Sequence, residues 1–462
     1  MQKSLSRRTF LKNTALTSAG FMIVPRHVLG GNGFVAPSDT VNVGLIGAGG
    51  RGNRNANALM ALKDVQITAI ADPANYWDLA NFYYRTEAGR GPVKKRLEKH
   101  YGSGLSIAEY TDFRKMLEQE SGLDAVLCAT PDHTHAYVSL MSMRAGKHVY
   151  CEKPLTHNIW EAREVRKVAK ETGLATQMGN QLHSSKGIRL TVEYLRAGAI
   201  GKVHEVHAWV GATRWTVGLT AVPSNSHPVP QGLDWDVWLG PRAKRDFHST
   251  YAPVSWRDYW DFGCGGMGDF GCHDLDAAVW GLDLDAPNQI MLHPAGYSDQ
   301  DIVPYGEIGY FHFPARGEQA AVKLNWYTGG LKPDVPEMLP QDLVLAGRGA
   351  LYVGEKGMML YEGSGKAPRL FPEELNRSFS LTEPSLAPTN GHHRDWIDAI
   401  KGGAPASSNF DYGARLTEIT LLGVLSLRMG KKILWDSENM KARGLPEADA
   451  FIQEKVRKGW EM

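Results

Sequence analysis

From residue 40 onward, short apolar runs alternate with segments whose apolar side chains recur at helical spacing. Residues 41–46 form the first apolar run, and residues 53–62 follow with a helical pattern. The same succession predicts strands over 65–73, 123–131, 147–154 and 174–180, and helices over 108–122, 135–146 and 158–173. Because parallel strands buried on both faces read as near-continuous apolar runs, the pattern predicts a doubly wound Rossmann domain with a parallel sheet.

The second half of the chain has a different pattern. Residues 184–211 predict a helix, a turn and a strand, and residues 309–316, 320–330 and 342–363 predict strands of an open, mostly antiparallel sheet. A chain of 462 residues is too long for one ordinary core. We therefore expect a leader at 1–35, a Rossmann domain at 38–180 and an α+β domain at 181–462. The segment 73–109 exceeds a minimal crossover and predicts an added helical excursion.

Charge and composition exclude several classes of protein. Residues 1–35 hold five basic residues and no acid, so the remainder has 46 basic against 50 acidic residues, a net charge of −4. A mildly acidic protein without a basic stripe is not expected to bind nucleic acid. Four cysteines are too few for a disulfide framework in a chain of this length, and no run after the leader approaches the roughly 18 apolar residues of a membrane span.

The first residues resemble an export signal. Paired arginines in Ser6-Arg7-Arg8-Thr9-Phe10-Leu11-Lys12 precede a modestly apolar stretch, which is the layout of a twin-arginine signal peptide. The alternative is a frayed basic N-terminus. The signal predicts a periplasmic protein, exported folded by the twin-arginine machinery and without a stable membrane anchor.

A glycine-rich turn follows the first predicted strand. Gly47, Gly49 and Gly52 form G-x-G-x-x-G between a strand and a helix. In this motif the first glycine permits the tight turn, the second lets the backbone approach a pyrophosphate, and the third lets helix and strand pack closely. The helix N-terminus then presents free N–H groups to the phosphates.

Asp72 ends the second predicted strand, twenty residues after Gly52. An acid at this position accepts hydrogen bonds from the adenosine ribose and repels a 2′-phosphate. Since no Arg or Lys follows directly in Asp72-Pro73-Ala74-Asn75-Tyr76-Trp77, we favour NAD over NADP. The alternative is a plain turn residue before Pro73.

The carboxyl ends of parallel strands meet at one rim of the sheet, where ligands of doubly wound folds bind. The residues expected to contact the cofactor there are Gly47, Gly49, Gly50, Arg51, Gly52, Asp72, Thr130, Pro131, His133, His135, Glu152, Lys153 and Asn180.

With the glycine turn, Thr130-Pro131-x-x-x-His135 and Glu152-Lys153-Pro154 in this order, the chain resembles the glucose–fructose oxidoreductase / inositol dehydrogenase / MocA family. Downstream, Asp269 and His273 have the D-x-x-x-H spacing of that family, and the resemblance covers nearly all of the chain after residue 40. It implies an enzyme in which Lys153, Asp269 and His273 form the catalytic site between nicotinamide and substrate.

The implied roles suit these residue types. Oxidising a secondary alcohol requires a base at the hydroxyl, which His273 provides near its ordinary pKa. Lys153 would hydrogen-bond the reacting oxygen, and Asp269, one helical turn before His273, would orient the imidazole or bind a sugar hydroxyl. The alternatives are a surface lysine, a structural histidine and a helix-capping aspartate.

Cys264, Asp269, Cys272 and His273 are close in sequence, but their spacing lacks C-x-x-C and the family needs no metal here. We therefore expect no metal. The cysteines are interpreted as small apolar side chains, with a Cys264–Cys272 disulfide as the alternative in an exported protein.

Residues 214–241 and 251–263 are rich in Trp and Pro with little periodicity, as in long loops that lie over binding sites. Trp256, Arg257 and Trp260 lead directly into the Asp269 segment and are expected at the substrate, together with Lys153, Asp269 and His273. Flat apolar rings and charged forks suit a carbohydrate. By resemblance, the free face of the second sheet predicts a homodimer or homotetramer.

These features predict an NAD(P)-dependent oxidoreductase that acts on a secondary hydroxyl of a sugar, glycoside or cyclitol. Free NAD is not expected outside the cytoplasm, so the cofactor would be tightly bound and carried out with the folded protein. One alternative is an NAD-dependent glycoside hydrolase of the same superfamily, which oxidises the sugar transiently and cleaves by elimination. Another is a non-catalytic sugar-binding protein on the same fold.

Overall fold

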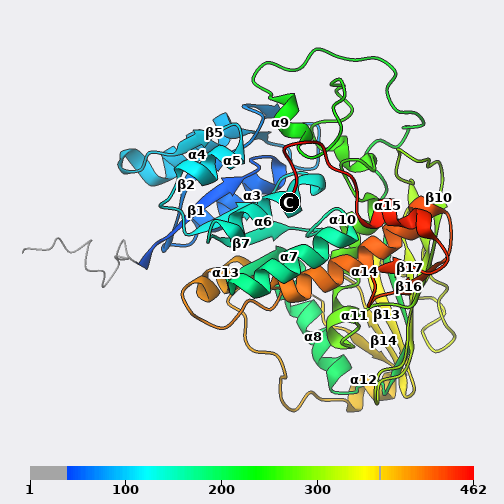
Figure 1. Ribbon diagram of the computed structural model, residues 1–462. Helices are drawn as coiled ribbons and strands as arrows, with labels where there is room; N and C mark the ends of the chain where they lie inside the picture. Colours follow the sequence, from blue (N-terminus) through cyan, green and yellow to red (C-terminus); the bar gives the residue numbers. More distant parts are fainter. Residues whose placement is uncertain (1–38, 364–365) are drawn as a thin grey trace, which may run out of the picture.

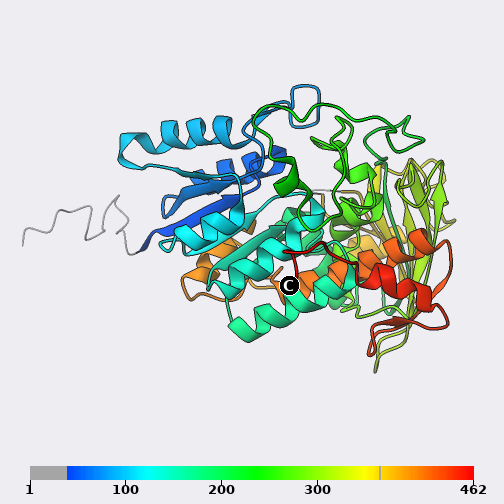
Figure 2. The ribbon, with the colours of Figure 1, turned by 45° about the horizontal axis from the view of Figure 1, so that its top comes forward.

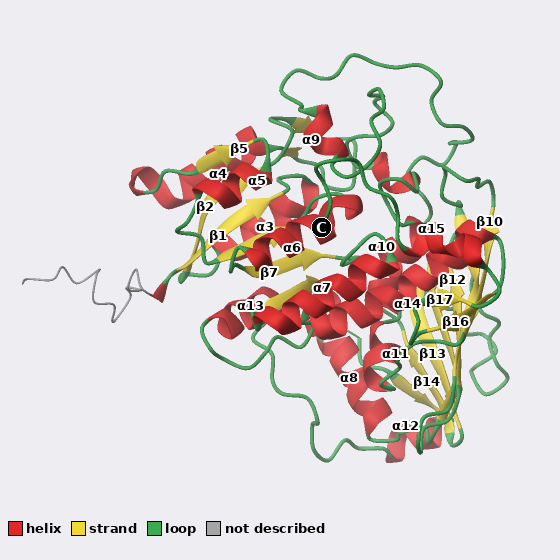
Figure 3. Ribbon diagram, in the orientation of Figure 1, coloured by secondary structure: helices red, strands yellow, loops and turns green. Residues whose placement is uncertain are grey.

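The computed structural model describes residues 39–363 and 366–462; the leader expected at 1–35 lies outside them. Two β-sheets dominate this part of the chain, and helices pack between them (Figures 1 and 3). The earlier part of the chain forms the first sheet, and the later part forms the larger second one. The predicted fold class, a Rossmann domain joined to an α+β domain, is confirmed.

The first sheet has six parallel strands. Its order across the sheet is β5 (Ala108–Tyr110), β2 (Val65–Ala71), β1 (Val41–Ile46), β6 (Ala125–Cys128), β7 (His148–Glu152) and β8 (Thr176–Gly179). The order reverses at β1, where the chain crosses from one half of the sheet to the other. Ligands of open α/β sheets bind beyond the strand ends at such a switch point.

Helices cover both faces of the first sheet. One face carries α3 (Gly50–Met60), α4 (Arg90–Tyr101) and α13 (His392–Ile400); the other carries α5 (Phe113–Gln119), α6 (Asp132–Arg144) and α7 (Ile159–Thr172). Leu45 and Leu59 pack with Trp396 of α13 in the core of the first face. A helix from far beyond residue 180 therefore completes the Rossmann layer.

Local sequence signals fix several helix ends. At the start of α7, the N–H of Glu161 donates to Asn158 Oδ1 at 3.0 Å, and the Glu161 side chain accepts from the N–H of Asn158. This capping box satisfies backbone donors that the first turn leaves free. The helix ends at Gly173, whose φ of 64° is the left-handed conformation that glycine favours.

The helix predicted over 108–122 is wrong in its first part. Residues Ala108–Tyr110 form the edge strand β5, which pairs with β2, and the helix α5 starts only at Phe113. Asp112 caps this helix by accepting from the N–H of Arg114 at 2.9 Å. The open edge of β2 decides the conformation of these three residues, and the local apolar pattern did not reveal that edge.

The excursion after Asp72 contains the predicted helix, α4, and also a short ribbon of β3 (Trp77–Asp78) and β4 (Glu87–Ala88). The ribbon packs near α3: the ring of Tyr84 lies directly against Gly50, where any side chain would collide with it. The guanidinium carbon of Arg54 in α3 lies 4.4 Å from the ring centroid of Tyr83 and 5.1 Å from that of Tyr84. The excursion therefore lies over the start of the glycine turn.

The second sheet has nine strands among the described residues. Its order is β15 (Arg369–Phe371), β14 (Gly357–Tyr361), β13 (Arg348–Gly354), β9 (Val203–Val210), β12 (Val322–Tyr327), β11 (Gly306–Phe313), β10 (Gln289–Ala295), β16 (Ile433–Asp436) and β17 (Lys441–Ala442). Only the β9–β12 pair is parallel. The sheet is mostly antiparallel, as predicted.

Four helices lie on the face of the second sheet that looks toward the Rossmann domain: α8 (Lys186–Arg196), α10 (Gly265–Asp274), α11 (Asp276–Gly281) and α14 (Phe410–Met429). The long helix α14 packs along α7 and joins the two domains into one continuous core. Shorter helices are α9 (Trp235–Leu239), α12 (Glu373–Ser378) and α15 (Asp449–Ile452). Within the described ranges, no helix combines the length and apolar character that crossing a bilayer demands.

Candidate functional site

The glycine turn forms a cradle at the end of β1. Gly47 has φ 87°, and a side chain there would lie 2.6 Å from the backbone of Ala129. A side chain on Gly52 would lie 1.9 Å from the carbonyl oxygen of Gly47, so this glycine lets helix α3 pack closely. A side chain on Gly49 would meet open space. That space, at the N-terminus of α3, fits the pyrophosphate of a dinucleotide.

Asp72 lies at the end of β2 beside this cradle. Its Oδ2 accepts from the N–H of Ala48 at 2.7 Å, and its Oδ1 accepts from the N–H of Ala74 at 2.8 Å. Burial raises the pKa of Asp72 to about 6, although these hydrogen bonds and Arg90 oppose the shift. The carboxylate also lines the cavity, where its remaining lone pairs suit ribose hydroxyls.

Arg90 was not found by sequence reasoning. This residue begins α4, eighteen residues after Asp72, and donates to the carbonyl oxygen of Asp72. It also pairs with Glu109 at 3.1 Å. Arg90 therefore places a positive charge near Asp72, the acid that favours NAD, although no Arg or Lys follows Asp72 directly in the sequence.

A cavity of about 400 Å³ connects the cradle to the second domain. The first domain contributes the glycine turn, Asp72 and the ends of β6 and β7. The second domain contributes α10, Arg348 of β13 and parts of the 212–263 loop. Among the residues singled out in the sequence, those lining it are Gly47, Gly49, Gly50, Arg51, Asp72, Thr130, Pro131, His135, Glu152, Lys153, Trp256, Arg257, Asp269 and His273.

Lys153 and Asp269 form an ion pair within this cavity. Nζ of Lys153 donates to the backbone carbonyl oxygen of Asp269 at 2.6 Å and also to its carboxylate. Nε of Arg257 lies 3.7 Å from the same carboxylate oxygen. Burial alone would raise the pKa of Asp269, but the charges of Lys153 and Arg257 hold it well below its usual range. Asp269 is therefore ionised.

His273 lies one helical turn further along α10. Among the described residues its Nδ1 has no hydrogen-bond partner, although the atom is buried. Burial, followed by the charges of Lys153 and Arg348, holds its pKa well below the ordinary histidine value. The imidazole is therefore neutral and accepts a proton at one ring nitrogen. His273 also lines the cavity, so its ring is placed to contact a bound ligand.

Two expectations for this trio need correction. Asp269 does not orient the imidazole, because its carboxylate is hydrogen-bonded to Lys153 instead. The pKa of His273 is also not near its ordinary value, since burial and neighbouring cations lower it. The sequence placed both side chains on one helix face, but it did not show the cations that converge there.

Glu152 is held by three side chains from two segments. Its Oε1 accepts from Asn55 Nδ2 and Gln181 Nε2, each at 2.7 Å, and Arg51 Nε lies 3.9 Å from Oε2. Oε2 is buried without a hydrogen-bond partner among the described residues. Glu152 thus fixes Arg51 beside the glycine turn and retains one free acceptor.

Of the residues expected at the cofactor, Gly52, His133 and Asn180 do not line the cavity, and Trp260, expected at the substrate, does not line it either. The ring nitrogens of His133 lie 3.3 and 3.0 Å from the carbonyl oxygens of Phe262 and Trp238. Asn180 Nδ2 donates to Asp276 at 3.2 Å, and its Oδ1 accepts from Ser408. Both side chains join the two domains, and nothing in the local sequence distinguishes that role from cofactor binding.

Cys264 and Cys272 are free and contact different groups. The thiol of Cys264 lies 3.7 Å from the carbonyl oxygen of His157, and that of Cys272 lies 3.8 Å from the hydroxyls of Thr417 and Thr420. The disulfide alternative is therefore not adopted here.

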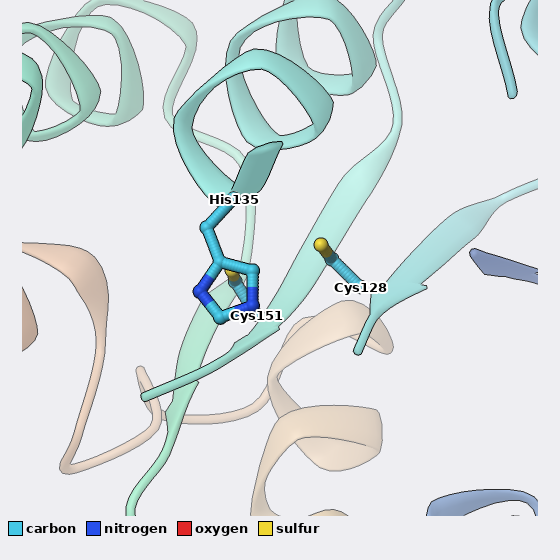
Figure 4. Close-up of side chains that lie close together, drawn as sticks. All are labelled: Cys128, His135 and Cys151. Atoms are coloured by element: carbon cyan, nitrogen blue, oxygen red, sulfur yellow. The ribbon is translucent and has the colours of Figure 1, made fainter. Parts of the chain in front are cut away.

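A different cluster joins Cys128, His135 and Cys151, whose polar side-chain atoms lie within 4.8 Å of one another (Figure 4). Both cysteines sit on paired strands, in register. His135 Nδ1 lies 2.7 Å from the carbonyl oxygen of Pro154, and Nε2 lies 2.9 Å from that of Thr130. Because both nitrogens face carbonyl oxygens, the imidazole braces the two loops that follow β6 and β7 and offers no nitrogen to a metal.

Around Arg257 the cavity has an aromatic and cationic wall. The guanidinium of Arg257 lies 4.0 Å from the ring centroid of Trp256 and 5.7 Å from that of Trp215. Asp132, at the start of α6, also lines the cavity, and burial raises its pKa to about 7. A wall that combines flat rings with charged groups can bind a hydroxylated ring.

Three other residues that line the cavity were not predicted. Arg348 is held by Asp274, with Nη2 to Oδ2 at 2.9 Å. Tyr84 comes from the excursion and Trp460 from the last residues of the chain. None belongs to a motif, so only the folded chain brings them to the site.

Two family models match the chain. Residues 41–180 match the model described as an oxidoreductase family with an NAD-binding Rossmann fold. Residues 202–311 match the C-terminal alpha/beta domain of the same oxidoreductase family. Together they span the glycine turn, Lys153, Asp269 and His273.

Curated proteins that are similar to this chain match only part of it. A "Glycosyl hydrolase family 109 protein" of Shewanella pealeana is 27% identical over 227 residues, 46% of this chain and 47% of the relative. A "Levoglucosan dehydrogenase" of Pseudarthrobacter phenanthrenivorans is 25% identical over 163 residues, 35% of this chain and 39% of the relative. The matches thus span about half of these relatives or less.

Among solved structures, the WlbA dehydrogenase of Bordetella pertussis, determined with NADH and UDP-GlcNAcA, superposes with a TM-score of 0.58. The alignment covers 86% of this chain and 99% of that one at 17% identity. At this identity the likeness shows a shared fold.

Proposed function

The chain belongs to the glucose–fructose oxidoreductase / inositol dehydrogenase / MocA family of NAD-binding oxidoreductases, and from this premise we propose that it oxidises a secondary hydroxyl of a sugar, glycoside or cyclitol with a tightly bound NAD. One observation carries the proposal. The Lys153–Asp269 pair and His273 line a single cavity with the glycine turn and Asp72.

The residues divide the work of binding the nucleotide. Gly47, Gly49 and the N-terminus of α3 would hold the pyrophosphate, and Asp72 would accept hydrogen bonds from the adenosine ribose. Lys153, at the far side of the cradle, would lie between the nicotinamide and the substrate. Bound NAD supplies the acceptor for the hydride that leaves the carbinol carbon, so the alcohol becomes a ketone once its hydroxyl proton is also removed.

Lys153 and His273 act on the hydroxyl group. Nζ of Lys153 uses two of its hydrogens for Asp269 and has a third for the substrate oxygen. This hydrogen bond stabilises negative charge as the O–H bond breaks. The neutral His273 receives the proton. Asp269 keeps Lys153 oriented and compensates its charge.

The alternative, an NAD-dependent glycoside hydrolase, has support of its own. Several relatives carry the name "Glycosyl hydrolase family 109 protein". In that chemistry the new ketone acidifies the neighbouring C–H and a base removes that proton. Elimination expels the aglycone, and water adds to the resulting C=C bond before the ketone is reduced again. His273 and Asp132 are two of the groups lining the cavity that can act as this base.

One experiment separates the two chemistries. The full chain is purified without added nucleotide, and the absorbance of its bound nicotinamide is followed while single sugars and glycosides are added. Lasting reduction by one sugar, reversed by a ketose, supports the oxidoreductase. Release of aglycone without lasting reduction supports the hydrolase. Absence of any response to the whole panel, with no nucleotide retained, contradicts both.

We also propose export to the periplasm with the nucleotide already bound. The paired arginines in residues 1–35 resemble a twin-arginine signal, and that export route carries folded proteins. A sugar or ketose would then reoxidise the bound NADH in place. A homodimer or homotetramer built on the second sheet is proposed as well.

A further inference from the structure

The segment 453–462 returns from the second domain to the first. It leaves α15 at the edge of the second sheet and runs back to the region of α6 and α9, where the chain is drawn in dark red (Figures 1 and 2). The backbone N–H of Arg457 donates to the carbonyl oxygen of Pro241 at 3.0 Å. None of the sequence motifs named above falls in this segment.

A buried ionic cluster fixes the start of the segment. Glu454 accepts from Arg242, which follows α9, and from Arg428 of α14. It also lies 3.0 Å from Nδ1 of His157. Burial would raise the pKa of Glu454, but Arg242 and the other cations hold it well below its usual range. The carboxylate is therefore charged and links three segments.

Arg457 fixes the middle of the segment. Its guanidinium donates to the Asp236 carboxylate at 2.6 Å and to the backbone carbonyl oxygens of Asp236 and Gly240. Both partners belong to α9 or its C-terminal cap. Since Val237 and Trp238 of the same helix line the cavity, Arg457 ties the segment directly to a wall of the site.

Trp460 is the residue of the segment that reaches the cavity. Its side chain is 6% exposed and lines the cavity. Arg114 lies 4.3 Å above its ring, and the rings of Phe113 and Tyr137 lie 6.1 and 5.8 Å away. The indole thus packs against α5 and α6 of the first domain.

The position of Trp460 identifies the end of the cavity that it closes. The N–H of Asp72 donates to the carbonyl oxygen of Tyr110 at 3.1 Å, so the β5–α5 connection lies beside Asp72. Thr111 and Phe113 of this connection line the same cavity. Trp460 is therefore on the Asp72 side, where the adenosine half of a dinucleotide binds, and the Lys153–Asp269 pair marks the other side.

We propose that residues 453–462 form a clasp on the adenosine end of the cofactor site. Trp460 contacts the bound adenosine half, and the segment must detach from α9 before the dinucleotide can exchange. The inference rests on the proposed binding of NAD by this cavity. It supplies a physical reason for slow release, because leaving requires breaking the Arg457 contacts and exposing the indole. The group recognised is the adenosine part of a dinucleotide.

The test measures how fast bound NADH leaves the full chain. NADH is bound, an excess of NAD is mixed in, and the decay of NADH fluorescence gives the release rate. Arg457→Ala is compared with Lys458→Ala, since Lys458 is the neighbouring basic residue and its side chain is exposed. We expect Arg457→Ala and Trp460→Ala to accelerate release by about tenfold or more, Trp460→Phe to act less, and Lys458→Ala to leave the rate unchanged.

The possible results are distinct. Equal release rates in the wild type, Arg457→Ala and Trp460→Ala, in proteins with wild-type thermal unfolding, would overturn the clasp and leave the proposed function intact. If Trp460→Ala unfolds early, Arg457→Ala decides, because Arg457 does not line the cavity. A wild-type chain that binds no NADH would refute the proposed function, and the clasp with it.

Discussion

Lys153 and Asp269 lie 116 positions apart in the sequence, yet Nζ of Lys153 donates to the carbonyl oxygen of Asp269 at 2.6 Å and to its carboxylate. Lys153 follows a strand of the Rossmann sheet, and Asp269 belongs to helix α10 of the second domain. The pair therefore exists only when the two domains are packed together. It places an ammonium group between the nucleotide cradle and the aromatic wall.

Replacing Lys153 tests the reaction. Lys153→Ala removes the hydrogen bond to the reacting oxygen, and we expect kcat to fall by about a hundredfold to ten-thousandfold. The bound nucleotide should remain, because the glycine turn and Asp72 are intact. The measurement is nicotinamide reduction in a single turnover. Lys167→Ala is the matched control, since that side chain is 60% exposed, and an equal loss in both variants would contradict the assignment.

Replacing His273 tests the proton acceptor. His273→Ala should lower kcat strongly in either chemistry, with nucleotide affinity close to that of the wild type. Burial, followed by the charges of Lys153 and Arg348, holds the pKa of His273 well below its ordinary value, so the wild type should not lose activity through histidine protonation near pH 6.5. The exposed His204 supplies the control variant His204→Ala. Unchanged kcat in His273→Ala would rule out its role.

Nucleotide affinity should depend on pH through Asp72. Burial raises the pKa of this carboxyl to about 6, so it is ionised above that value and becomes protonated as the pH falls through it. The protonated acid loses acceptor capacity for ribose hydroxyls. We expect the Kd for NAD to rise by about tenfold between about pH 7 and pH 5, and to be nearly flat in Asp72→Asn. Titration of NADH fluorescence checks this, and the same slope in both proteins would contradict it.

Substitutions at two glycines of the same turn should have different effects on stability and on nucleotide binding. A side chain at Gly49 meets open space in the protein, whereas one at Gly52 would lie 1.9 Å from the carbonyl oxygen of Gly47. Gly49→Ala should therefore unfold at the wild-type temperature and lose nucleotide binding, because its methyl group occupies the pyrophosphate position. Gly52→Ala should lower the unfolding temperature, because helix and strand must separate.

The paired glycine measurement is a thermal melt with a binding titration on each variant. Gly104 provides a control, since a side chain there meets open space far from the cradle. Normal NAD binding by Gly49→Ala would show that the pyrophosphate does not lie where the turn predicts. Wild-type stability of Gly52→Ala would show that the close packing of α3 is not required.

The sequence by itself determined most of the Rossmann half, apart from the edge strand β5 and helix α13. A parallel sheet buried on both faces gives its strands and helices distinct local apolar patterns. The sequence also singled out strand-end residues that line the cavity, such as the glycine turn, Asp72 and Lys153. These positions carry motif signals because each is tied to one local turn.

Tertiary structure decided which of these residues share the cavity and what they do there. His133 and Asn180 form hydrogen bonds at the junction between domains. The carboxylate of Asp269 pairs with Lys153, and burial together with neighbouring cations lowers the pKa of His273. Tyr84, Arg348 and Trp460 reach the cavity from segments without motifs. Such contacts join residues far apart in the chain, and their energies depend on burial and on charges that no local pattern records.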